Sequence, residues 1–198
     1  WLSDRVGRKP VLLITITGTL GAYLLLAFSS SLIMLFLVRF LGGAMAANMS
    51  VAHALVADIS RAEDRTRDIA RLSGAAGLGF VAGPAIGGLL AGIDVGASVF
   101  LLPYLTAALF SGIALVLAIF LIRETVSSEQ KSRARLSSGL WSWRVAFSHG
   151  PTRLLLCLMF APPFVFSGVE VIIVLWSERA WGWGPQENGY FYAWMGGC

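Results

Sequence analysis

The chain begins with the segment L-S-D-R-V-G-R-K-P (residues 2–10), and an uncharged apolar run from Val11 to Phe28 follows it directly. A helix of this length can span the ~30 Å hydrocarbon core of a bilayer. Pro10 suits its first turn, where the N–H that proline lacks has no partner, and Gly7 suits a sharp turn. Short loops rich in lysine and arginine stay on the cytoplasmic side. The segment is therefore expected to be a cytoplasmic loop from which a helix runs outward.

The composition is that of a membrane protein. Hydrophobic residues make up 57% of the chain, charged residues only 13%, and the mean hydropathy is +0.75. We therefore expect an all-α, polytopic membrane helix bundle. The net charge of +4 follows from loop topology, so no nucleic-acid partner is expected. Cys157 and Cys198 form no disulfide framework or metal-ligand pattern, and we expect no cofactor or metal. Both ends look cut, because the chain lacks an initial Met and stops within a span.

Five apolar stretches are expected to span the membrane, at about residues 11–28, 32–56, 72–93, 99–122 and 154–176, with a truncated sixth from about residue 190. Nearly all of the 15 lysine and arginine residues fall into the loops at 1–10, 58–71 and 123–153, whereas the opposite side holds only Arg179. These three loops are therefore expected to be cytoplasmic.

Three further features belong to the second half of the chain. Residues 136–147 carry Leu, Trp and Val at roughly helical spacing, which indicates an interfacial helix within the polar segment. Pro162 and Pro163 are expected to interrupt the fifth span. The Trp- and Gly-rich stretch from Glu178 to Gly189 is expected to form an outer loop with aromatic anchors at the headgroup level.

The opening segment resembles the signature G-x-L-a-D-R-x-G-R-K-x-x-L between the second and third helices of the major facilitator superfamily of transporters. The matching residues are Leu2, Asp4, Arg5, Gly7, Arg8, Lys9 and Leu12. The resemblance implies a partial twelve-helix fold, covering about helices three to eight, that is monomeric in its full-length form. Residues 1–122 would belong to the N-terminal six-helix bundle, residues 123–153 would be the cytoplasmic linker, and residues 154–198 would begin the C-terminal bundle.

Arg39 lies within the second span. Placing an arginine there costs at least about 2.5–3.5 kcal/mol on insertion scales, so such residues usually face a polar cavity or a partner. A side chain that reaches back to the interface is the alternative. The pattern Leu35-x-x-x-Arg39-x-x-x-Gly43 resembles the superfamily's fourth helix, and the resemblance implies a role for Arg39 in proton coupling.

The third span contains glycines at every fourth position. Gly79, Gly83 and Gly87 share one helix face, where a neighbouring helix could approach closely, and Pro84 removes one backbone donor beside it. Ordinary small-residue packing would give the same pattern. The sequence resembles the fifth-helix motif of proton-driven antiporters, which implies export and a sealed helix interface. The residues that match are Gly79, Gly83, Pro84, Gly87 and Gly88, while Ala70 replaces the motif's first glycine.

Glu170 is the only carboxylate deep within a predicted span. Desolvation disfavours the charged form of a carboxylate, so such a group can take up and release a proton as water access alternates. Pro162, Pro163 and Gly168 are expected to loosen the helix near a substrate cavity. A structural pair with Arg39, or with a residue in the missing parts of the carrier, is the alternative.

Charged residues at the inner ends of the helices are expected to form a cytoplasmic gate. Asp58 with the following D-R-T-R (residues 64–67) resembles the superfamily's charged loop between helices four and five. The resemblance implies that the gate's partners lie on the other half of the carrier, mostly beyond Cys198. The proposed gate residues are Asp4, Arg5, Gly7, Arg8, Lys9, Asp58 and Arg65.

Together these features predict a proton-coupled exporter of small amphipathic compounds such as drugs, working by alternating access in the plasma membrane (the inner membrane of a bacterium). Its partners would be the small-molecule substrate, protons and the lipid bilayer. The alternative on the same fold is an uptake symporter or facilitator for a sugar or organic acid. A receptor or scaffold stays open as a third class. An enzyme is not expected, because the sequence contains no nucleophile–base constellation or phosphate-binding loop.

Overall fold

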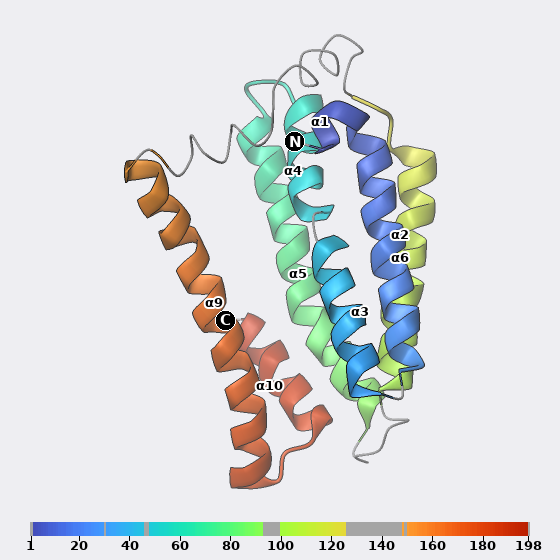
Figure 1. Ribbon diagram of the computed structural model, residues 1–198, viewed down its shortest axis with the longest axis vertical. Coiled ribbons are helices and arrows are strands. Elements are labelled where there is room, and N and C mark those ends of the chain that lie inside the picture. Colours follow the sequence, from blue (N-terminus) through green and yellow to red (C-terminus); the bar gives the residue numbers. More distant parts are fainter. Residues whose placement is uncertain are drawn as a thin grey trace.

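The computed structural model describes residues 2–29, 31–45, 48–92, 100–125, 148 and 150–197 (Figure 1). These residues form helices and short connections, and the described ranges contain no strand, which confirms the all-α class. The helices are α1 (Leu2–Val6), α2 (Arg8–Ala27), α3 (Leu32–Met45), α4 (Asn48–Ile59), α5 (Arg65–Ala91), α6 (Leu101–Leu121), α9 (Gly150–Trp181) and α10 (Pro185–Gly197).

Five helical stretches are long and apolar enough to cross a membrane, which confirms the five complete spans predicted from the sequence. They are Arg8–Ala27, Leu32–Ile59, Arg65–Ala91, Leu101–Leu121 and Gly150–Trp181. The second stretch includes both α3 and α4, and residues 46–47 between them lie outside the described part. Helix α10 occupies the region of the predicted sixth span.

Helices α2 to α6 stand side by side as one bundle, in which α2 packs against α3, α4 and α6 (Figure 1). Helix α5 contacts α4 and α6, and it also packs against α10. Buried apolar residues concentrate where α2 meets α4, at Val11, Leu12 and Val51. Most other large apolar side chains are exposed, as expected for helices that face lipid.

Two helix boundaries differ from the sequence prediction. Helix α5 begins at Arg65 instead of about residue 72, since the charged segment already adopts helical hydrogen bonding from the Asp68 N–H to the Asp64 carbonyl (3.0 Å). Helix α10 begins at Pro185 instead of about residue 190, with proline in its favoured first position. The outer connection is therefore a short turn at Gly182–Gly184, and the expected longer loop is wrong.

Helix α9 continues from Gly150 to Trp181 through Pro162 and Pro163, so the expected interruption of the fifth span is wrong. Each proline removes only one backbone donor, and the remaining hydrogen bonds of a helix in an apolar setting are costly to break. Figure 1 shows α9 leaning away from the bundle, with α10 between it and α5. The predicted interfacial helix at residues 136–147 lies outside the described residues.

Candidate functional site

Gly7 makes the turn that the sequence predicts between α1 and α2. Its backbone has φ 127° and ψ 154°, a conformation that residues with a Cβ rarely adopt, and the residue is buried. The turn leaves the Gly7 N–H bonded to the Ser3 carbonyl at 3.0 Å. It also places Arg8 at the first position of α2, facing the inner ends of the neighbouring helices.

Arg8 is the centre of a polar cluster at this end of the bundle. Its Nε lies 3.0 Å from Oδ2 of Asp58 at the end of α4, and its Nη1 donates to Oγ of Ser3 at 2.7 Å. The Arg8 backbone N–H donates to Oε1 of Glu124 at 3.0 Å, and the Thr125 hydroxyl donates to Asp58 at 3.4 Å. Arg8 and Asp58 are thus brought together, whereas Ser3, Glu124 and Thr125 were missed by the sequence prediction.

The partners of this Arg8–Asp58 cluster that the structure describes all lie within residues 1–125. The further partners on the other half of the carrier, which the resemblance implies, stay a prediction. Lys9 also binds within the bundle, since its Nζ donates to the Ile119 carbonyl oxygen near the end of α6 at 2.8 Å. A cation beside the last carbonyls of a helix is favourable. The cluster therefore connects α1, α2, α4 and the end of α6.

The other proposed gate residues lie on α1 and at the start of α5. Arg65 is exposed at the first position of α5. The charged loop is organised by Asp68, which pairs with Arg71 at 3.1 Å and accepts the Ser60 hydroxyl at 2.8 Å. Arg5 is half-buried in α1. The side chain of Asp4 lies outside the described part of the structure.

Arg39 lies on α3, and its Nη2 donates to the Tyr104 hydroxyl on α6 at 3.3 Å. It also lines a cavity of about 400 Å³, with polar groups from α2 and α4 in the wall. The other lining residues are Thr19, Ala22, Tyr23, Leu26, Val38, Gly42, Gly43 and Asn48. Arg39, which is exposed and lies in a helical stretch long enough to span a membrane, therefore has a hydroxyl partner and borders a mainly apolar cavity.

Glu170 lies on α9 and is half-buried. Its backbone carbonyl accepts a hydrogen bond from the Tyr192 hydroxyl of α10 at 2.8 Å. No ion pair joins Glu170 to Arg39 in the described part of the chain, so the alternative of a structural pair between them is not what the structure has. Glu170 belongs to the α9–α10 side of the molecule and Arg39 to the α2–α6 bundle.

The glycines of α5 make a close helix contact, but not on the face that the sequence predicts. A Cβ added at Gly79, Gly83 or Gly87 would meet nothing within 4 Å in the described part of the chain. At Gly88 it would lie 2.7 Å from the Gly189 Cα of α10, and at Gly189 it would lie 2.7 Å from the Pro84 carbonyl oxygen. Within this chain the packing face is therefore set by Gly88, because α10 crosses there.

A buried polar pair that the sequence prediction missed fixes α10 to α9. Ser177, 1% exposed, has its Oγ 2.9 Å from Oδ1 of Asn188, which is 5% exposed. The Asn188 Nδ2 donates to the Gly184 carbonyl at 3.0 Å, and the Gly184 N–H donates to the Glu187 carboxylate at 2.8 Å. This Ser177–Asn188 clasp holds the tight turn, and it sets the position of Gly189 against Gly88.

Comparisons with known proteins agree with this arrangement. The family model described as Major Facilitator Superfamily matches residues 1–198. The chain is 33% identical to the class B tetracycline resistance protein of Escherichia coli over 98% of this chain and 48% of that protein. It is 26% identical to multidrug resistance protein 2 of Bacillus subtilis (strain 168) over 93% of this chain and 46% of that protein.

Among solved structures, the human organic anion transporter MFSD10 (TETRAN) superposes with a TM-score of 0.68 at 25% identity, over 98% of this chain and 49% of that one. The chain thus spans about half the length of the relatives it matches. These matches place the chain within a family of multi-pass membrane proteins. A helical bundle whose family match runs from its first residue to its last leads to one conclusion: the chain belongs to the Major Facilitator Superfamily.

Proposed function

We propose that the protein containing this chain is a proton-coupled exporter of small amphipathic compounds that works by alternating access in the plasma membrane as a monomer. The observation that carries the proposal is the similarity to tetracycline and multidrug resistance proteins along nearly the whole chain. The ionisable residues Arg39 and Glu170, both on membrane-spanning helices, support the coupling to protons.

In this mechanism Glu170 is the proton carrier. It lies on α9 beside α10, whose Tyr192 hydroxyl binds the Glu170 backbone. Protonation removes a charge from the membrane interior, and loss of the proton restores it. The two protonation states therefore favour different packings of α9 and α10 against the bundle, which is what a coupled transporter needs. Arg39 would bias the same equilibrium from the cavity on the bundle side.

The inner ends of the helices would act as a gate. The Arg8–Asp58 cluster holds α1, α2 and α4 and the end of α6 in one arrangement. The Gly88–Gly189 contact is a place where α5 and α10 can approach without side chains between them. The bundle has a helix contact free of side chains at its edge, at Gly88 and Gly189. This contact supports the proposal that the two halves of the carrier move as rigid bodies.

The proposal is tested with the full-length protein in inside-out vesicles that have an acidic interior. Tetracycline and ethidium are the probes, and accumulation reports export. We expect Glu170→Gln to lower proton-driven accumulation at least about tenfold, because the amide cannot carry a proton, with an unchanged amount of protein in the membrane.

Glu63→Gln is the matched control, because Glu63 is exposed in the inner loop. It should transport normally. Undiminished accumulation with Glu170→Gln would disprove the role of this carboxylate. If the acidic interior instead drives the probe out of the vesicles, the protein is an uptake symporter.

A further inference from the structure

A second feature, separate from the proposed proton site, lies at the outer turn between α9 and α10. A cavity of about 500 Å³ is enclosed there by residues of both helices and by Phe100, which precedes α6. This volume is within the range of small-molecule sites. The other lining residues are Val174, Glu178, Gly182, Trp183, Gly184, Pro185, Glu187 and Asn188.

The chemistry of this outer cavity favours a cation. Two of its described lining residues, Glu178 and Glu187, are carboxylic acids, and none is basic. Trp183 and Phe100 supply aromatic faces, which attract cations through their ring quadrupoles. A flat aromatic cation would use both kinds of wall, since its rings stack on the side chains while its charge meets a carboxylate.

The walls are held in place before any ligand arrives. The Trp183 ring packs between Trp181 and Phe191, with ring centroids 4.8 and 6.1 Å away. Glu187 is fixed by the Gly184 N–H at 2.8 Å, and Asn188 by the Ser177–Asn188 clasp. A site with fixed side chains loses less conformational entropy when it binds.

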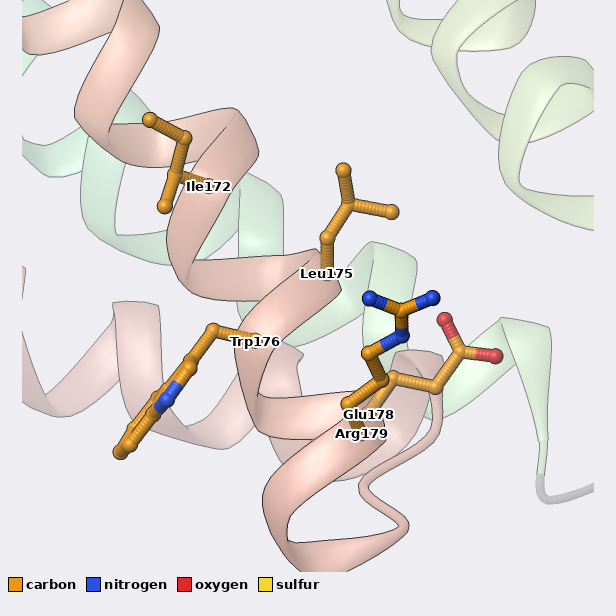
Figure 2. A pocket seen from close by; sticks show the side chains of 5 residues that line it. All are labelled: Ile172, Leu175, Trp176, Glu178 and Arg179. Carbon is orange, nitrogen blue, oxygen red and sulfur yellow. The ribbon is translucent and has the colours of Figure 1, made fainter.

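Glu178 also borders a neighbouring cavity of about 680 Å³, which Arg179 lines as well. Figure 2 shows the side chains of Glu178 and Arg179 projecting to the same side of α9, while Trp176 projects to the other. Arg179 therefore lowers the attraction of this region for a cation without lining the outer cavity itself.

We propose that the outer cavity is a binding site for small aromatic cations on the side of the membrane opposite the basic loops. The proposal rests on the proposed export function in one respect, since it gives an exported cation a site on its way out. Its test measures protection of a cysteine from labelling instead of transport, so that it can fail while proton-driven export holds, and the reverse.

The test uses full-length protein in which Pro185→Cys provides the sole cysteine at the rim of the cavity. A membrane-impermeant maleimide, added outside intact cells, should label it. Ethidium, an aromatic cation, should slow this labelling, whereas the anion anilinonaphthalene sulfonate should not. Ser31→Cys, on the outer turn before α3 and outside the cavity, is the matched reporter and should be labelled at one rate throughout.

Two sets of variants then test the charge. Glu178→Gln and Glu187→Gln keep the size of the side chain, and in the Glu187→Gln variant the new amide oxygen can still accept the Gly184 N–H. Each should weaken the protection by ethidium about fivefold, the upper range for a partly exposed charge pair. Arg179→Gln leaves every wall residue in place and should strengthen it. Glu63→Gln should change nothing.

Equal slowing of both reporters by ethidium would overturn the proposal. So would unchanged protection in a double variant that combines Glu178→Gln with Glu187→Gln. If the double variant does not reach the membrane, the Arg179→Gln variant still tests the effect of charge on binding. If the glutamine variants lose the protection by ethidium but Arg179→Gln does not strengthen it, the electrostatic part of the proposal is wrong.

Discussion

The two polar clusters of this protein stabilise their surroundings by different means. At the inner end of the bundle, the Arg8–Asp58 pair is charged and partly exposed, with side-chain exposures of 16% and 36%. At the outer turn, Ser177 and Asn188 are neutral and almost completely buried. Solvent and salt screen a charged, half-exposed pair, whereas a buried neutral pair is costly to leave incomplete. We therefore expect the end that holds the Arg8–Asp58 pair to open more easily than the α9–α10 turn.

The contact that the clasp supports should give the largest effect on stability. Gly88→Ala would put a methyl group 2.7 Å from the Gly189 Cα, so α10 has to shift, at a cost of about 1–3 kcal/mol for overpacking. Gly83→Ala is the matched change on the same helix, where a methyl group meets nothing within 4 Å. It should leave stability unchanged or raise it by up to ~1 kcal/mol, because alanine favours helix. Thermal unfolding of the full-length protein in detergent compares the two, and equal melting temperatures would rule out the close contact.

Changes to the Ser177–Asn188 clasp should give the second-largest effect on stability. Ser177→Ala removes the hydroxyl next to the Asn188 side-chain oxygen, so an acceptor stays buried without that partner, and we expect a loss of about 1–2 kcal/mol. The double variant Ser177→Ala/Asn188→Leu removes both polar groups and should lose less than the sum of the single changes. The loss should not depend on salt. A strongly salt-dependent loss would show that the comparison of the two clusters is wrong.

The inner cluster should give the smallest effect. Asp58→Asn keeps a hydrogen-bond acceptor for Arg8 but removes the charge, and for this partly exposed pair we expect a loss of about 0.5–1 kcal/mol at low salt. The difference between wild type and variant should shrink as sodium chloride is raised toward 1 M, because screening weakens the pair. A difference that stays constant across this range would contradict an electrostatic origin.

Much of the fold could be read from the sequence because lipid imposes simple rules. Apolar length gave the five spans, the distribution of basic residues gave their predicted orientation, and Gly7 marked a turn that only glycine makes easily. The sequence placed Arg8 and Asp58 together in one proposed gate, but it did not predict that they pair with each other.

Other features depend on how helices rotate and cross, which periodicity does not encode. The spacing in the sequence favours the face of Gly83, yet the close contact with α10 lies at Gly88. Ser177 and Asn188 become partners only because the turn at Gly182 folds back tightly. Glu124 reaches Arg8 only through the return of α6 to the inner end. These contacts required the structure.

The uninterrupted course of α9 has a consequence for the membrane around it. Its 32 residues, at ~1.5 Å each, make a rod about 48 Å long, well beyond a hydrocarbon core of ~30 Å. Arg153 near one end and Arg179 near the other belong in the headgroup layers, so a lean of the helix adjusts its apolar length to the bilayer. We therefore expect lipid chain length to change the tilt of α9 and, through the Ser177–Asn188 clasp, the position of α10.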